Sequence, residues 1–110
     1  MASLIELCLK REGYETQLAS DGFQAGALLG TFQPHLMTLD LSMPRLNGMG
    51  VLQYLKKDPR HGSLKILVVS GLDKPSLQAA VYAGADVALA KPFESADLIK
   101  HVRNLLDKNA

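Results

Sequence analysis

Three polar side chains follow apolar runs of this sequence and could together form one chemical site. They are Asp40 at the end of 36–41, Ser70 at the end of 65–71 and Lys91 at the end of 86–92. An unpaired buried carboxylate is costly, whereas a nearby ammonium stabilises its ionised form. We therefore expect Asp40 to have partners, with Lys91 and Ser70 as the candidates.

An aspartate flanked by a cation and a hydroxyl donor is suited to covalent chemistry as a nucleophile. Lys91 and Ser70 could balance the negative charge of an incoming phosphoryl group. Pro92 follows Lys91, and an X-Pro bond can be cis at modest cost, which would fix how the lysine enters the site.

Helical and strand patterns alternate along the chain and would position these residues. Apolar periodicity and turn residues predict helices over the first residues to Glu12 and over 23–31, 48–57, 73–83 and 95–107. Alternation predicts a half-exposed strand over 14–19, and continuous apolar runs predict strands buried on both faces at 36–41, 65–71 and 86–92. This order indicates an α/β fold, an open parallel sheet with helices on both sides, whose site lies at the carboxyl ends of the strands.

Several residues are expected to serve packing rather than chemistry. We expect Leu77, Ala80 and Val81 to face inward from the helix over 73–83. The glycines at 22, 26 and 30 are expected to permit close packing of a helix on the sheet, and Gly13 and Gly84 to end helices. The three histidines have no metal-like spacing, and no glycine-rich phosphate loop is present.

Composition limits the function classes. The chain has 110 residues, 47% of them hydrophobic and 21% charged, as expected for one globular domain. Twelve basic and eleven acidic side chains give a net charge of +1, which does not favour nucleic acid as a partner. No apolar run is long enough to span a bilayer and no signal-peptide pattern is present, so we expect a cytoplasmic protein with no membrane contact.

The motifs resemble those of one family. Asp40 opens an Asp-x-x-Met-Pro-x-x-x-Gly motif that includes Pro44 and Gly48, and "VVSG" and "GADVALAKPF" follow. In these motifs, and from its first helix to its last, the chain resembles the receiver domain of two-component response regulators. The resemblance implies a flavodoxin/CheY-like sheet with the strand order 2-1-3-4-5 and a single receiver domain over 1–110.

The resemblance also implies roles for individual residues. Asp40 would be the phosphoacceptor, receiving a phosphoryl group from a histidine kinase, a phosphotransfer protein or a small phosphodonor. Ser70 and Lys91 would bind the phosphoryl oxygens, and the main-chain carbonyl of Ser42 would join Asp40 as a ligand of Mg²⁺. Such a domain is not an enzyme; it signals to a downstream effector by shifting between two conformations.

Two features depart from the family pattern. Ala88 stands where most receivers have an aromatic residue that changes rotamer on activation. The chain also begins in the first helix, so we expect an N-terminally truncated receiver without the central first strand and its acidic pair. Mg²⁺ would then lose most of its anionic ligands. The strands could pair directly across the gap, the first helix and strand could be released, or another chain could fill the gap. We favour the last, in a homodimer for example, because exposed apolar strand edges recruit partners.

Two other functions remain open. The first is a pseudo-receiver that binds or dimerises without phosphoryl chemistry, which Ala88 and the missing acids favour and the intact set of Asp40, Ser70 and Lys91 opposes. The second is a small hydrolase with Asp40 as nucleophile, which would need a water-activating base and a pocket that the sequence does not offer convincingly.

Overall fold

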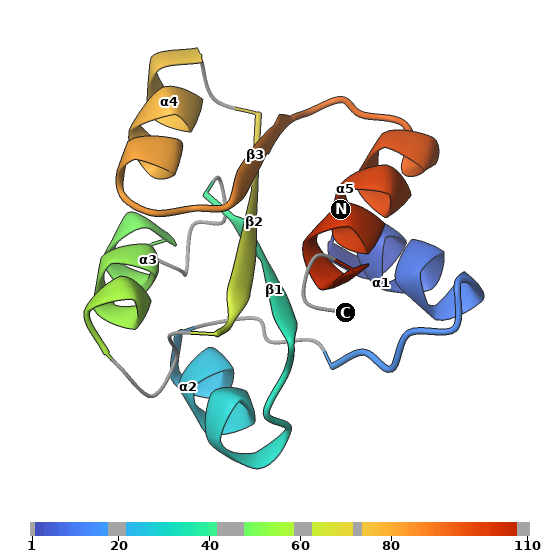
Figure 1. Ribbon diagram of the computed structural model, residues 1–110, viewed down its shortest axis with the longest axis horizontal. Helices are drawn as coiled ribbons and strands as arrows, with labels where there is room; N and C mark the ends of the chain where they lie inside the picture. Colours follow the sequence, from blue (N-terminus) through green and yellow to red (C-terminus); the bar gives the residue numbers. More distant parts are fainter. Residues whose placement is uncertain (1, 18–21, 42–47, 59–62, 72–73, 108–110) are drawn as a thin grey trace.

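The fold is known from a computed structural model that describes residues 2–17, 22–41, 48–58, 63–71 and 74–107. Five helices and three strands follow one another along these residues in the order α1-α2-β1-α3-β2-α4-β3-α5 (Figure 1). The helices are α1 (Ala2–Arg11), α2 (Gly22–Thr31), α3 (Gly48–Lys57), α4 (Lys74–Tyr82) and α5 (Ser95–Asp107). The strands are β1 (Leu36–Asp40), β2 (Lys65–Ser70) and β3 (Val87–Ala90).

The three strands form one parallel sheet, as the apolar runs predict, and their order in it is β1-β2-β3. The expectation that every strand is buried is confirmed only for β2, of which all residues after Lys65 are buried. In β1 only Leu39 is buried, and β3 has no buried residue. Within the described residues, the two outer strands each pair with a strand on one side only, so their side chains are covered from fewer directions.

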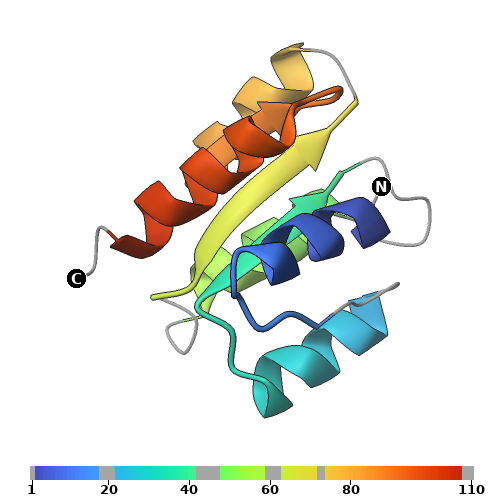
Figure 2. The same ribbon diagram turned by 90° about the vertical axis from the view of Figure 1, so that its right-hand side faces the viewer.

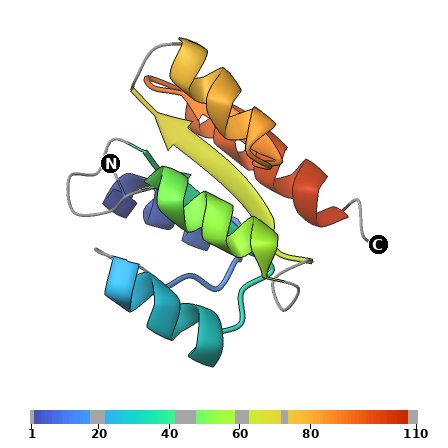
Figure 3. The same ribbon diagram turned by 90° about the vertical axis from the view of Figure 1, so that its left-hand side faces the viewer.

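Helices cover both faces of the sheet. Figure 1 shows α1 and α5 on one side of the strands and α2, α3 and α4 on the other, and Figures 2 and 3 show these two layers from opposite sides. Such a layered arrangement is the one that an alternating pattern with apolar strands predicts. None of the helices described here has the length and apolar character that crossing a membrane requires.

Each face of the sheet has its own hydrophobic core. On one face, Ile66 and Val68 of β2 pack with Leu52 and Leu55 of α3 and with Ala80 of α4. On the other face lie Leu67 and Val69 of β2 with the buried residues of α1 and α5, namely Ile5, Leu9, Leu98, Val102 and Leu105. Successive side chains of a strand point to opposite faces, so β2 contributes buried residues to both cores, and β1 and β3 also have residues packed against each of them.

The inward face of α4 differs in part from the prediction. Ala80 is fully buried and Leu77 is partly buried, but Val81 is 49% exposed. Tyr82 beside it is 96% exposed. Ala80 is buried in the first core and Ala83, which follows α4, packs against the same core, whereas Val81 between them lies toward solvent.

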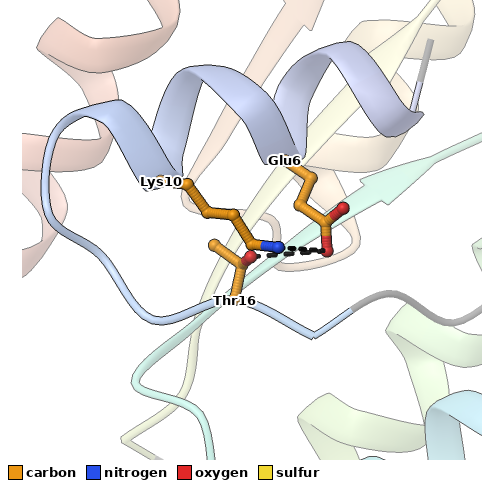
Figure 4. Close-up of polar contacts among 3 residues, drawn as sticks. All are labelled: Glu6, Lys10 and Thr16. Atoms are coloured by element: carbon orange, nitrogen blue, oxygen red, sulfur yellow. Dashed lines mark hydrogen bonds and ion pairs between the residues drawn. The ribbon is translucent and has the colours of Figure 1, made fainter.

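The strand predicted over 14–19 is wrong for the residues that the structure describes, since 14–17 are not part of a strand. The amide of Tyr14 donates to the carbonyl of Leu9 at 3.1 Å and so caps α1. The Thr16 hydroxyl donates to the Glu6 carboxylate at 3.4 Å, and this carboxylate also pairs with Lys10 at 3.8 Å (Figure 4). Alternation alone does not form a strand; a neighbouring strand must supply the hydrogen bonds.

Glycines end two helices as predicted. Gly13 follows α1 with φ +91° and Gly84 follows α4 with φ +120°, a conformation that side chains disfavour. After α4, the amide of Gly84 donates to the carbonyl of Val81 at 3.0 Å and the amide of Ala85 to that of Ala80 at 3.1 Å. The chain is thereby turned into β3.

The expectation of close glycine packing in α2 is wrong for two of the three positions. A Cβ atom added at Gly26 or at Gly30 would meet no atom within 4 Å. Both residues lie on the exposed side of α2, whereas Leu29 packs against the first core. Small residues at these positions are therefore not required by helix–sheet contact.

Candidate functional site

The carboxyl ends of the three strands bring together the polar residues that the sequence predicts. Asp40 is the last residue of β1, Ser70 is the last residue of β2, and Lys91 directly follows β3. Parallel pairing aligns these ends, because Asp40 is in register with Val69 and Ser70 with Ala90.

Asp40 and Lys91 form the central contact of the site. The Lys91 Nζ atom donates to Asp40 Oδ2 at 2.6 Å, a short charge-assisted hydrogen bond. The side chains are only 18% and 12% exposed for Lys91 and Asp40. A carboxylate in such a setting needs a cation, and Lys91 provides it. The prediction that Asp40 has Lys91 as a partner is confirmed.

Backbone hydrogen bonds fix the position of the Lys91 main chain, from which its side chain extends. The Lys91 amide donates to the carbonyl of Ser70 at 2.9 Å, and the Leu41 amide donates to the carbonyl of Val69 at 3.0 Å. Hydrogen bonding therefore continues one residue past the ends of β1 and β3. The peptide bond between Lys91 and Pro92 is cis.

Ser70 is the one buried polar residue among those described. Its side chain is fully enclosed, and no buried side-chain nitrogen or oxygen in the described part of the chain lacks a hydrogen-bond partner. Period-two alternation along β2 puts Ser70 on the same face as Ile66 and Val68. Ala88, in register with Val68, packs against the core of that face, so this position holds a methyl group and no ring.

Other predicted site residues are only partly placed. Gly48 is the first residue of α3, as expected from the turn before it. Ser42 and Pro44 lie outside the described residues. Of the two Mg²⁺ ligands that the resemblance implies, Asp40 alone is thus described.

The described residues do not by themselves make a magnesium site. Among them, no group of three or more His, Cys, Asp and Glu side chains could hold a metal ion. Asp40 supplies one carboxylate, and one of its oxygens is bonded to Lys91. Mg²⁺ prefers six oxygen ligands, so this donor set falls short of what the ion requires.

A second polar cluster, which the sequence pattern did not indicate, lies at the opposite end of the sheet. The Asp86 carboxylate accepts a hydrogen bond from the Ile66 amide at 2.8 Å and pairs with Lys56 of α3 at 3.9 Å. The Asp86 amide in turn donates to the carbonyl of Ile66 at 2.9 Å. This cluster ties α3 to the starts of β2 and β3, far along the strands from Asp40.

A family model for the response regulator receiver domain matches residues 1–103. Among characterised relatives, RpaA of Synechocystis, a DNA-binding dual master transcriptional regulator, is 34% identical over 107 residues. The DNA-binding response regulator MtrA of Mycobacterium tuberculosis is 30% identical over 109 residues. The matches cover 96% and 99% of this chain but only 44% and 47% of the two relatives, so the chain spans less than half of their lengths.

Solved receiver structures have the same fold. The signal receiver domain of a response regulator from Bermanella marisrubri superposes with a TM-score of 0.88 and 47% identity, covering 94% of this chain and 87% of that chain. The receiver domain of the Francisella response regulator 1452 gives a TM-score of 0.87 and 28% identity, covering 99% and 89%. The predicted flavodoxin/CheY-like α/β fold is confirmed.

Proposed function

Since this chain belongs to the response regulator receiver family, we propose that Asp40 accepts a phosphoryl group from a histidine kinase, a phosphotransfer protein or a small phosphodonor. The observation that carries this proposal is the 2.6 Å contact between Lys91 and Asp40 at the carboxyl edge of the sheet. Domains of this family generally signal rather than catalyse, and their relatives here include DNA-binding regulators. The downstream partner would be an effector domain or protein.

The transfer is a simple displacement at phosphorus. An Asp40 carboxylate oxygen forms a bond to the phosphorus, and the bond between phosphorus and the donor breaks. The electron pair of that bond leaves with the donor, as histidine imidazole or, from acetyl phosphate, as acetate. Lys91, already beside the carboxylate, would neutralise charge on the phosphoryl oxygens. The Ser70 hydroxyl would donate a hydrogen bond to one of these oxygens.

Receivers generally bind Mg²⁺ at the phosphorylation site, where the ion neutralises phosphoryl charge. In this chain Asp40, with the carbonyl of Ser42, would contribute to holding it. Because the described residues lack a full ligand set, we expect weak binding of Mg²⁺. Isothermal titration of the protein with MgCl₂, with Asp40→Asn as control, measures this directly.

The signal would leave through the face of α4, β3 and α5. Its helix α4 carries Tyr82 and Val81, two of the large hydrophobic residues that are exposed in the described part of the chain. Because Ala88 stands where most receivers have an aromatic side chain, the conformational change that follows phosphorylation of Asp40 would reach α4 through Ser70 and the end of β2. We place this receiver, residues 1–110, in the cytoplasm.

Intact-mass spectrometry tests the proposed reaction. The protein is incubated with acetyl phosphate and MgCl₂, with Asp40→Asn as the matched control. The proposal predicts one phosphoryl adduct on the unmodified chain and none on Asp40→Asn. An adduct on both proteins would exclude Asp40 as the acceptor.

A phosphorylation-incompetent binding module is the second candidate, favoured by the missing metal-ligand cluster among the described residues. In that case β1 offers the binding element, since it pairs with β2 on one side and, in the described part of the sheet, with no strand on the other. A strand from a second copy would complete it. Light scattering showing a monodisperse monomer at high concentration would count against this dimer.

A further inference from the structure

Lys91 must cross the end of a strand to reach Asp40. Lys91 follows β3, Asp40 ends β1, and β2 lies between these two strands. The backbones of the two residues are therefore about two strand spacings apart, roughly 10 Å, and the Lys91 side chain, the 2.6 Å hydrogen bond and the shorter Asp40 side chain cover this distance together. Its route runs over the residues that end β2.

Gly71 is the residue that this route passes. It directly follows Ser70, whose carbonyl accepts the Lys91 amide at 2.9 Å. A Cβ atom added at Gly71 would lie 3.9 Å from Cδ of Lys91, a close contact with a residue distant along the chain. The aliphatic stem of Lys91 thus lies in van der Waals distance of the place where a side chain at residue 71 would begin.

The backbone itself does not demand glycine here. Gly71 is exposed and, unlike Gly13 and Gly84, does not have a positive φ. A methyl group would make an ordinary contact with Lys91 Cδ. Any larger side chain places its γ atoms about 1.5 Å beyond Cβ. A β-branched residue has two γ atoms, and few of its rotamers point both of them away from Lys91.

From this geometry we propose that Gly71 is a positioning residue, which keeps the path of the Lys91 side chain open between β3 and Asp40. It acts through Lys91 and does not touch the reacting atoms. The effect of Gly71 on phosphoryl transfer rests on the proposed function. The ion pair between Lys91 and Asp40 that Gly71 positions is present without any phosphodonor.

The first test measures the ion pair without phosphorylation. Urea unfolding of Asp40→Asn, Lys91→Met and the double variant gives the coupling between the Asp40 and Lys91 side chains. The same cycle is measured in three backgrounds, with Gly71, Gly71→Ala or Gly71→Val. We expect a coupling of about fivefold in the unfolding equilibrium constant with Gly71 and with Gly71→Ala, and none with Gly71→Val. Equal coupling in all three backgrounds would overturn the proposal. Gly71→Thr, of the same shape as valine, replaces it if Gly71→Val does not unfold cooperatively.

The second test measures adduct formation with acetyl phosphate. In the otherwise unchanged protein, Gly71→Val should slow adduct formation and Gly71→Ala should not. In a Lys91→Met background, Gly71→Val should have no further effect on the rate. Equal slowing by Gly71→Val with and without Lys91 would show that residue 71 acts independently of the lysine. If the unmodified chain forms no adduct, the proposed function fails, while the unfolding test still decides the role of Gly71.

Discussion

The Lys91 Nζ atom lies 2.6 Å from Asp40 Oδ2, although their strands are separated by β2. This contact joins the two outer strands of the sheet at their carboxyl ends. It is largely withdrawn from water, since the two side chains are 18% and 12% exposed. Salt should therefore screen it less than a surface ion pair.

Asp40→Asn should destabilise the fold, because it leaves the Lys91 charge without its carboxylate in a mostly buried position. We expect a loss of about 1–2 kcal/mol in the free energy of unfolding, below the cost for fully buried pairs since Lys91 can move toward solvent. Urea denaturation measures it. Glu15→Gln, at an exposed residue outside the helices, is the control and should change stability by less than about 0.5 kcal/mol. An unchanged stability in Asp40→Asn would mean that the pair contributes nothing to the fold.

Gly84→Ala should destabilise more than Gly13→Ala. Both glycines have a positive φ, and alanine there costs about 1 kcal/mol. At Gly84, however, the added Cβ would lie 2.7 Å from Cγ of Lys56, whereas at Gly13 it would meet nothing within 4 Å. The extra loss at Gly84 should disappear in the double variant with Lys56→Ala. Equal losses at both glycines would show that Lys56 moves aside without cost.

Gln33→Gly should stabilise the protein. Gln33 has φ +53°, a left-handed conformation that glycine adopts more readily than any side-chain-bearing residue. The expected gain is about 0.5–1 kcal/mol, measured by thermal or urea unfolding. Gln53→Gly, at an exposed position within α3, is the opposite control and should cost about 1 kcal/mol. A loss of stability in Gln33→Gly would contradict the assigned backbone strain.

Gly26→Ala and Gly30→Ala should each stabilise α2. Both positions are helical and have room for a methyl group, so alanine gains helix propensity without a clash. We expect about 0.5–1 kcal/mol from each change, nearly additive in the double variant. Circular dichroism melting is sufficient to measure it. A decrease in melting temperature would show instead that these glycines are packed closely against a neighbour.

Local sequence patterns correctly predict several elements of this fold. The helix at Ser95–Asp107 has the predicted bounds, because its apolar stripe is regular and the two ends carry recognisable residues. The meeting of Asp40 and Lys91 also followed from the sequence, since parallel strands present their carboxyl ends at one edge.

Features that depend on contacts between elements distant in the sequence are predicted less well from local patterns. Alternation at 14–17 indicated a strand, but no described strand pairs with this segment, and Thr16 bonds to Glu6 instead. The glycines of α2 have a spacing typical of close packing, yet exposure depends on how the helix is rotated. The proximity of Gly71 to Lys91 requires knowing that Lys91 reaches across β2, which spacing alone does not give.

The central claim is that Asp40 becomes an aspartyl phosphate, and chemical mapping of the acceptor tests it most directly. Treatment with acetyl phosphate and MgCl₂ is followed by reduction with borohydride, which converts an aspartyl phosphate to homoserine, and then by peptide mass spectrometry. We predict homoserine at position 40 and unreduced aspartate at Asp58, Asp86 and Asp97. Unreduced Asp40, or homoserine at another position, would contradict this account of the site.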